Sequence, residues 1–379
     1  MENVEEIRCL FPIVKHKIFM NHAAQSPLPK PVADAVKRYV DDYSNFGASN
    51  LPELSDLGKS IFAELIGAKQ SEIALVENTS MGLNIAANIL RYPPGSKVVT
   101  TDLEYPSVAY PWLRKNLNVK VHYVKNVNGK VPLEEVEKAV DDKTVAVAVS
   151  HVEYANGFRN DLKALGEIAH RHGAYLIVDA IQSAGVVPID VKKDNVDFLT
   201  TACYKWLLSP PGAAYLYVKE ELIQTFEPPL TGWASVDQKI FETVDFWDIW
   251  SLRLSETASR FEVGTPSAVS FIGAAEAIKM LLGFGISNIE QRVLKLTDRL
   301  IDLAKASGFM LQTPDEKPHR SGIVNIRTDK AQQIVKKLGE KGIVVSARAR
   351  GIRISPHFYN TEEEIETLFE EIVRLEKLF

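Results

Sequence analysis

A lysine and an aspartate stand in the stretch of this chain whose residue types and spacing best permit covalent chemistry. An apolar run over residues 175–178 ends at Asp179, and a second, largely apolar run that begins at residue 196 leads to Lys205. Lysine side chains avoid full burial unless something compensates for the lost hydration. An imine with an aldehyde cofactor would provide that compensation, and the acid would balance a protonated ring nitrogen of the cofactor. A surface lysine at a strand end and an acid in a turn are the alternative interpretation.

The segment ENTSMGLN, residues 77–84, has residue types suited to holding an anion. It joins an expected strand to an apolar helical run, so Thr79 and Ser80 would lie where the helix begins. Unpaired backbone N–H groups and the helix dipole favour negative charge at that point. An ordinary N-terminal cap has the same residue pattern, so the spacing alone leaves a phosphate site and a cap open.

Together with two further motifs, these segments resemble the class V aminotransferases, a family of pyridoxal phosphate (PLP) enzymes. The motifs are IFMNHAA over residues 18–24 and RISPHFYNT over residues 353–361, so the resemblance covers nearly the whole chain. The family includes cysteine desulfurases, kynureninases and isopenicillin N epimerase-like proteins. The resemblance implies fold type I of the PLP-dependent transferases and PLP as cofactor. It also implies two catalytic residues, Lys205 as the site of an internal aldimine and Asp179 as the partner of the ring nitrogen.

The same resemblance assigns binding roles along the chain. The cofactor-binding residues that it implies are Thr79, Ser80, Tyr105, Asp179, Gln182, Tyr204, Lys205 and Thr265. Arg353 matches the arginine that binds the substrate's α-carboxylate as a bidentate fork. Ala24 and His22 lie in the segment that lines the substrate site, although a structural role for His22 is an equal alternative. Thr265, in a Gly-Thr-Pro segment, matches a residue that reaches the phosphate of the other subunit, which implies a homodimer with sites at the interface.

Three places near the expected cofactor ring depart from the family pattern. One lies just before Lys205, where Ala202 and Tyr204 replace the usual Ser or Thr and His, so the phosphate contact is expected from Thr201 or Tyr204. Tyr105 stands where a histidine often stacks on the pyridine, and a tyrosine offers the flat face without an imidazole for proton transfer. Tyr154 stands where the desulfurase-like pattern has an asparagine. The contact to the ring oxygen is therefore expected from Tyr154, Asn156 or Gln182.

The elements that must position these residues alternate along the first two thirds of the chain. Short apolar runs predict strands at residues 72–76, 97–101, 119–123, 144–149, 175–178, 198–201 and 213–218. Amphipathic segments such as 161–169 lie between them, which predicts a mostly parallel α/β sheet covered by helices on both faces.

The last third has a different pattern. A long helix at 289–306, strands at 322–326 and 343–346, and a charged helix opened by a capping box at 361–364 predict a smaller α+β domain. We therefore predict a large PLP-binding domain over residues 17–280, with residues 1–16 and 281–379 forming the small domain.

Length and composition exclude several classes of function. A chain of 379 residues with 46% hydrophobic and 25% charged residues suits a globular protein of two domains. Its net charge of −5 gives no reason to expect nucleic acid or an anionic membrane as partner. The acidic residues 1–6 do not resemble a signal peptide and no apolar run approaches about 18 residues, so we expect a cytoplasmic protein. Two cysteines are too few for a disulfide framework, and the spacing of His170 and His172 does not suit a metal site.

Transamination is the reaction that we expect, with an amino acid and a keto acid as substrates. Cysteine desulfurases need a nucleophilic cysteine on a mobile loop before the carboxylate-binding arginine, and residues 344–351 contain none. The segment CYKWL over residues 203–207 is more similar to the epimerase-like and kynureninase branches, so a racemase or a lyase is the alternative. A non-catalytic PLP-binding protein is a further alternative, but it would need the lysine or the acid to be lost.

Overall fold

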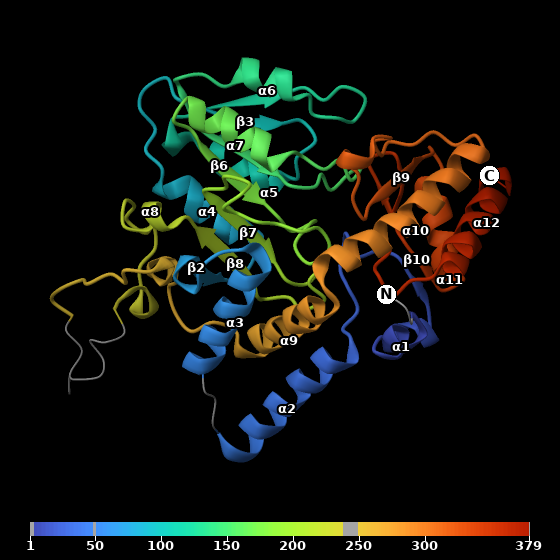
Figure 1. The fold of residues 1–379 in the computed structure, drawn as a ribbon, viewed down its shortest axis with the longest axis horizontal. Helices are drawn as coiled ribbons and strands as arrows, with labels where there is room; N and C mark the ends of the chain where they lie inside the picture. Colours follow the sequence, from blue (N-terminus) through green and yellow to red (C-terminus); the bar gives the residue numbers. More distant parts are fainter. Residues whose placement is uncertain (1–3, 48–50, 238–248, 379) are drawn as a thin grey trace.

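A seven-stranded sheet forms the centre of the larger part of the molecule (Figure 1). The computed structural model describes residues 4–47, 51–237 and 249–378. The strands lie in the order β2-β8-β7-β6-β5-β3-β4. Their bounds are β2 Ile73–Val76, β3 Lys97–Thr101, β4 Lys120–Val124, β5 Thr144–Ser150, β6 Tyr175–Asp179, β7 Phe198–Ala202 and β8 Ala214–Val218. Only β8 pairs antiparallel with its neighbours, so the prediction of a mostly parallel sheet is confirmed.

The central strands are apolar because both faces of the sheet are covered. In β6, Leu176 and Val178 belong to one hydrophobic cluster and Ile177, which points the other way, belongs to a second. All three side chains are almost completely buried. Strands that bury both faces become continuously apolar, which is the pattern read from the sequence. The covering helices include α4 Thr79–Ile89, α6 Leu133–Ala139, α7 Leu162–Arg171 and the single turn α8 Glu220–Ile223.

Three helices that the sequence analysis did not identify pack together below the sheet in Figure 1. They are α2 Lys30–Phe46, α3 Leu51–Ile66 and α9 Ala268–Phe284, and α9 contacts both of the others. Because α9 is buried on several sides, it is apolar almost all round and carries no clear stripe. In the parts of the chain that the structure describes, no single helix is long and apolar enough to cross a membrane. Helices α9 and α10 (Ile286–Ala306) reach that length and composition only as a pair bent by 80°.

The carboxy-terminal part forms the predicted smaller α+β unit. Strands β9 Val324–Arg327, β11 Ser346–Arg348 and β12 Gly351–Ile354 make an antiparallel sheet in the order β11-β12-β9. Helices α10, α11 Ala331–Glu340 and α12 Glu362–Leu378 pack on it around a third hydrophobic cluster. The final helix begins with the expected capping box, since Thr361 Oγ1 accepts from Glu364 N–H at 3.2 Å and the Glu364 carboxylate accepts from Thr361 N–H at 3.1 Å.

The amino-terminal segment joins this smaller unit. Strand β1 Ile18–Phe19 pairs in parallel with β10 Ile343–Val344, and Arg8 at the end of α1 Val4–Cys9 forms a 2.9 Å ion pair with Glu364. The predicted limit at residue 280 falls within α9. The limits of the two domains stay a prediction. Because β1 pairs with β10 of the small unit, the first limit, predicted at residue 17, is better placed after residue 19.

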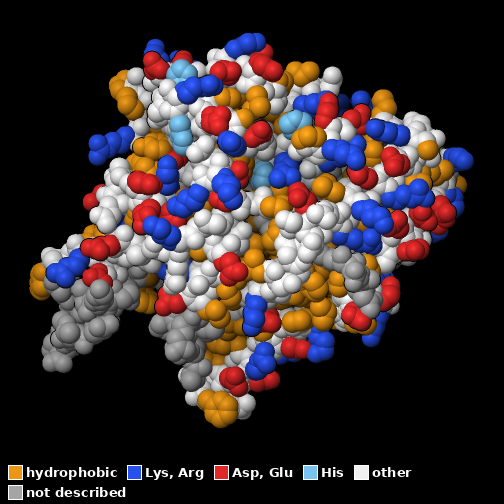
Figure 2. All heavy atoms as spheres, viewed as in Figure 1, with side chains coloured by type: hydrophobic (Ala, Val, Ile, Leu, Met, Phe, Trp, Pro, Cys, Tyr) orange, Lys and Arg blue, Asp and Glu red, His pale blue; other side chains and the backbone are white. Residues whose placement is uncertain are grey.

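Basic and acidic side chains are interspersed over the face seen in Figure 2. Many of them form exposed pairs such as Lys69–Glu220, with 2.5 Å between Nζ and Oε2. Exposed pairs of this kind contribute about 0–1 kcal/mol each. The stability of the fold therefore comes mainly from the three buried clusters.

Candidate active site

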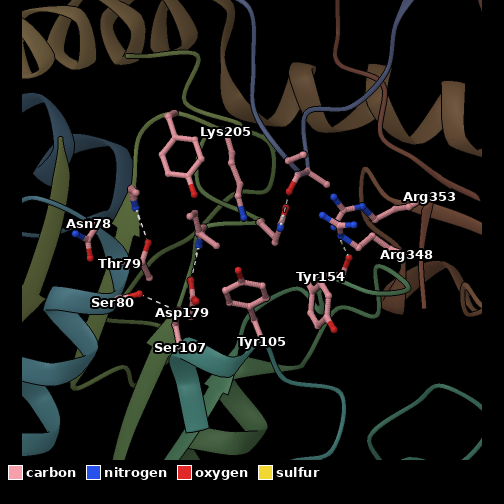
Figure 3. A pocket seen from close by; sticks show the side chains of 16 residues that line it. Asn78, Thr79, Ser80, Tyr105, Ser107, Tyr154, Asp179, Lys205, Arg348 and Arg353 are labelled. Carbon is pink, nitrogen blue, oxygen red and sulfur yellow. Dashed lines mark hydrogen bonds between the residues drawn. The ribbon is translucent and has the colours of Figure 1, made fainter. Parts of the chain in front are cut away.

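A cavity of about 270 Å³ opens where the parallel strands of the large sheet end (Figure 3). Strands β6 and β7 deliver Asp179 and Lys205 to it, and the small unit contributes Arg348 and Arg353. Carboxyl ends of parallel strands meet at one edge of a sheet, where α/β proteins bind their ligands. Residues from distant parts of the sequence therefore meet in one place.

Lys205 follows the carboxyl end of β7 and is only 9% exposed. Its Nζ lies 5.9 Å from the ring centroids of both Tyr105 and Tyr204. The hydroxyl of Ser26 holds the backbone of this turn by donating to the carbonyl of Lys205 at 2.5 Å. Burial, reinforced by the charge of Arg353, lowers the pKa of Lys205 to about 8, although Asp179 acts in the opposite direction. About a tenth of this amine is therefore neutral at pH 7, far more than for an ordinary lysine, and the neutral form is the one that a nucleophile or a base requires.

Asp179 is the last residue of β6 and is 2% exposed. Its Oδ1 accepts a hydrogen bond from the backbone N–H of Ile181 at 2.9 Å. Burial raises the pKa of Asp179 to about 6, while the Ile181 N–H and the charge of Lys205 act against that rise. A positively charged ligand atom beside this carboxylate would favour its ionised form.

Two acids close to Asp179, the half-buried Glu104 and the fully buried Glu153, were not recognised from the sequence. The carboxylate of Glu104 accepts from the backbone N–H of Ser150 at 2.7 Å and from its hydroxyl at 2.6 Å. Burial, together with the negative charge of Asp179, raises the pKa of Glu104 to about 8. Burial and the charge of Glu104 likewise raise the pKa of Glu153. Three neighbouring carboxyl groups cannot all ionise in the interior, and because the pKa of Asp179 is lower than that of Glu104, Asp179 keeps the charge of that pair.

Two arginines lie at the opposite side of the cavity from the start of α4 (Figure 3). Arg353 is 2% exposed, and it donates from Nε to the hydroxyl of Ser346 at 3.2 Å and from Nη1 to the carbonyl of Tyr154 at 2.9 Å. Burial and the charge of Arg348 lower the pKa of Arg353 to about 10. Arg353 therefore remains charged at neutral pH, and with Arg348 beside it this side of the cavity attracts an anion.

The start of α4 supplies the other anion-binding feature. Asn78 caps the helix by accepting from the N–H of Met81 at 2.9 Å. The hydroxyls of Ser80 and Ser107 lie 2.7 Å apart, and the hydroxyl of Thr79 accepts from the N–H of Ala202 at 2.9 Å. Hydroxyl groups around a helix N-terminus form a site for a phosphate group.

Comparison with known proteins decides the family. The Aminotransferase class-V family model matches residues 18–368. The chain belongs to this family. It is 33% identical to the protein named "Uncharacterized aminotransferase YcbU" of Bacillus subtilis, with 97% of each chain covered. It is 30% identical to a "Probable cysteine desulfurase" of Pyrococcus abyssi, with 98% of each covered.

Solved structures agree with this assignment. The apo structure of a cysteine desulfurase from Thermococcus onnurineus superposes with a TM-score of 0.91 at 30% identity, covering 100% of this chain and 99% of that one. The cysteine desulfurase CsdA of Escherichia coli gives 0.89 at 21% identity, with 100% of each chain covered, which speaks for the fold alone. The predictions of the class V family, of fold type I and of PLP as cofactor are confirmed.

The residues in the cavity of this class V enzyme fit PLP. Thr79, Ser80 and the helix start would hold the phosphate, Asp179 would face the ring nitrogen, and Lys205 offers the amine for the aldehyde. Ser107, which the sequence analysis did not identify, adds a hydroxyl to the phosphate end. The motif LEYPS could have indicated this serine, because Pro106 begins the short helix α5 Pro106–Ala109 and Ser107 is its second residue.

The other residues predicted to line the cofactor and substrate site differ in whether their side chains are exposed to the cavity or already hydrogen-bonded. Tyr105 lines the cavity with 48% of its surface exposed, so its ring face is available for stacking, and Tyr204 and Ala24 also line the cavity. Gln182 lines it too, but its amide is engaged at both ends. Its Nε2 donates to the carbonyl of Ala23 at 3.0 Å, and its Oε1 accepts from Trp206 Nε1 at 2.8 Å.

His22 does not line this cavity, although we expected it in the substrate site. Its ring is completely buried, with Nδ1 2.9 Å from the carbonyl of Ser355 and Nε2 3.0 Å from the hydroxyl of Tyr359. Burial and the neighbouring His357 keep the pKa of His22 well below its ordinary value. A neutral histidine with both nitrogens occupied ties the amino-terminal segment to the small unit, which supports the structural alternative.

Thr265 also lies outside the cavity of its own chain. It lines a separate hollow with Glu262 and Val263, next to the end of β2. This position is compatible with the expectation that Thr265 serves a site on another subunit, and that role stays a prediction.

The lowered pKa of Lys205 predicts an unusual pH dependence of labelling. Only the neutral amine reacts with acetic anhydride, and because the pKa is about 8, the neutral fraction rises as the pH increases through 8. We expect the labelling of Lys205 in the cofactor-free protein to rise with a midpoint near pH 8, against about 10.4 for an ordinary lysine. Competitive labelling followed by mass spectrometry measures this for every lysine peptide at once. A midpoint for Lys205 that coincides with that of the exposed lysines would contradict the burial argument.

Proposed function

We propose that this class V enzyme is an aminotransferase that acts on an amino acid held by Arg353. The observation that carries the proposal is the meeting of Lys205, Asp179 and Arg353 in one cavity, without a thiol beside them. Arg353 is placed to bind the α-carboxylate, and this directs the α-carbon toward Lys205. The presence of both the lysine and the acid argues against a non-catalytic binding protein.

The chain's own residues then have separable tasks. PLP supplies, when bound, an electron sink for the bonding electrons of the α-carbon. The neutral amine of Lys205 takes the α-proton and can return it to a different carbon, which is the proton shift that transamination requires. Asp179 would hold the ring nitrogen of the cofactor in its protonated form, and the arginines would hold the substrate. Tyr105 and Tyr154, whose rings meet edge to face at 5.2 Å, form the wall that restricts water.

The positions of both cysteines argue against sulfur transfer through an enzyme thiol. Cys203 is completely buried, and burial raises the pKa of its thiol well above the ordinary range. Cys9 is exposed on α1 and does not line the cavity. The segment before Arg353 is the tight hairpin of β11 and β12, which holds no cysteine.

A lyase that cleaves a carbon–sulfur bond is the second candidate. Several relatives at 28–30% identity carry the name "Probable cysteine desulfurase", and these names favour sulfur chemistry over transamination. Elimination of a β-substituent needs the same α-proton removal by Lys205 and needs no enzyme thiol. The geometry of the cavity suits both reactions up to that step.

A product screen separates the candidates. The PLP-loaded protein is incubated with single L-amino acids, with and without a keto acid such as 2-oxoglutarate. An aminotransferase converts the amino acid into its keto acid and passes the nitrogen to the acceptor, whereas a lyase releases ammonia, pyruvate and sulfide from cysteine without an acceptor. A racemase yields the D-isomer alone. Formation of sulfide with no transfer of nitrogen would overturn the aminotransferase proposal.

Removal of both cysteines provides an independent prediction. The double variant Cys9→Ser, Cys203→Ala should keep its kcat for the preferred amino acid within about twofold, because neither thiol reaches the substrate. A modest loss of stability, about 1 kcal/mol, is expected from the smaller side chain at position 203. Thermal unfolding and steady-state kinetics measure the two effects. If the wild type releases sulfide from L-cysteine and this variant does not, an enzyme thiol takes part and the protein is a cysteine desulfurase.

We also propose a homodimer with shared sites. Val263 precedes the Gly264-Thr265-Pro266 segment and Trp233 lies beside Gly264, and these two apolar side chains are 43% and 54% exposed. If Thr265 completes the neighbour's phosphate site, dilution to monomers should release PLP. Sedimentation velocity combined with the PLP content of each fraction tests this. A monomer that keeps its PLP and its full activity would contradict the proposal.

A further inference from the structure

We infer that the substrate carries a second carboxylate and that Arg348 binds it. The inference deepens the proposed function, since it rests on Arg353 as the ligand of the α-carboxylate. It is carried by the charges that line the cavity, by the placement of the two arginines on one hairpin and by the rigid backbone of that hairpin.

The charge of the cavity is unbalanced. Lys205, Arg348 and Arg353 line it, and Asp179 is the only carboxylate among its described lining residues. The phosphate end is built from hydroxyl groups and a helix start, so the arginines are not needed there. A buried guanidinium without an anionic partner is costly, and Arg353 is 2% exposed. The anionic partner of Arg353 is therefore expected from the substrate, and the exposed Arg348 adds a second positive charge on the same side of the cavity.

One carboxylate does not satisfy both arginines. Arg353 already gives donors to Ser346 and to the carbonyl of Tyr154, so it has room for one further bidentate partner. Arg348 donates to the carbonyl of Ala347 at 3.0 Å, which leaves most of its five N–H groups available. The α-carboxylate accounts for Arg353, and Arg348 is left for a second acid.

The hairpin places both guanidinium groups on the same side. Ser346 pairs with Arg353 across the two strands, and Arg348 lies two residues after Ser346. Residues two apart on a strand share a face, so Arg348 points the same way as Ser346, whose hydroxyl contacts Arg353. Figure 3 shows both arginines reaching into the cavity from one side, opposite Asn78 and Thr79.

The backbone that carries Arg348 is rigid. Ala349 and Arg350 form the two-residue turn with φ of 48° and 59°, a left-handed conformation that favours glycine or asparagine. The turn is held by Gln312, whose Nε2 donates to the carbonyl of Ala349 at 2.6 Å, and by Asn325, whose Nδ2 donates to the carbonyl of Arg348 at 3.1 Å. A side chain that starts from a fixed backbone loses less freedom when it binds an anion. The hairpin therefore suits a specificity device better than a mobile loop would.

Non-reacting ligands test the inference without relying on turnover. L-α-Methylaspartate and L-α-methylglutamate lack an α-proton and carry two carboxylates, and 2-aminoisobutyrate carries one. Calorimetry on the PLP-loaded protein should show that one of the two diacids binds at least about tenfold tighter than 2-aminoisobutyrate. Arg348→Gln should weaken that diacid about 10–100-fold and change 2-aminoisobutyrate by less than about twofold.

Matched variants separate the alternatives. Arg350→Gln removes a second exposed arginine of the same hairpin, outside the active-site cavity, and should leave the binding of all three ligands unchanged. Arg353→Gln should weaken all three ligands because it removes the partner of the α-carboxylate. Equal weakening of the diacid and 2-aminoisobutyrate by Arg348→Gln would show that both arginines share one carboxylate, and this would overturn the inference. A wild-type protein without preference for either diacid would overturn it too. Selective diacid binding without any keto acid formation would refute the proposed reaction and support the inference.

Discussion

Replacing Lys205 with alanine is expected to lower kcat for the preferred amino acid by about 10²–10⁴, the contribution of a positioned general base. The amine lies between two aromatic walls of the cavity, with Nζ 5.9 Å from the ring centroids of both Tyr105 and Tyr204. The variant should still bind PLP, because the phosphate contacts from Thr79 and Ser80 are unchanged. It should also fold, since it removes a buried lysine whose charged form the interior disfavours.

Three measurements separate this role from a structural one. Borohydride reduction of the PLP-loaded wild type followed by peptide mapping should find the pyridoxyl group on Lys205. Addition of methylamine should restore part of the activity of Lys205→Ala, because the shortened side chain leaves room for a small base. Thermal unfolding should show no loss of stability. A pyridoxyl group on another lysine, or a variant that turns over at the wild-type rate, would remove Lys205 from the mechanism.

Much of the large sheet could be predicted because its strands are buried on both faces. Strand β3 was predicted with its exact bounds, and the bounds of β6 and β8 were predicted to within one residue. A short, continuously apolar run that is bounded by polar turns has few interpretations other than a buried strand. Helix α9 was not identified for the opposite reason. Its neighbours α2 and α3 bury more than one side of it, which removes the polar face that periodicity detects.

Site residues could be predicted from the sequence where the chemistry requires one particular residue type. Lys205, Asp179 and Arg353 all line the cavity, as the motifs indicated. Glu104 was not singled out because an acid after a strand is ordinary in sequence, and only its contact with Ser150 in the interior makes it unusual. His22 was expected either beside the substrate or in a structural role, and its buried ring supports the structural role although its neighbours Ala23 and Ala24 line the cavity. The sequence does not tell which way a side chain in an irregular segment points.

Replacing Asp179 with asparagine is expected to slow α-proton removal by about 100-fold while the fold is retained. The neutral amide preserves the shape of the side chain and an oxygen that can accept from the N–H of Ile181. It cannot hold a ring nitrogen protonated, and a loss of two pKa units at that nitrogen corresponds to about 2.7 kcal/mol. The rate of deuterium incorporation at the α-carbon in D₂O, followed by NMR, reports this step without depending on product release.

The control for Asp179→Asn is Glu104→Gln, which removes a second acid of the same cluster. Glu104 bonds to Ser150 and is not among the residues that line the cavity, so it acts on the substrate only through Asp179. Because its pKa is raised to about 8, it is mostly neutral at pH 7, and its replacement by a neutral amide changes little charge. We therefore expect α-proton exchange in Glu104→Gln to stay within about fivefold of the wild-type rate at pH 7. Equal losses in the two variants would mean that the cluster supports the site only by packing, whereas unchanged exchange in Asp179→Asn would show that the ring nitrogen needs no charged partner.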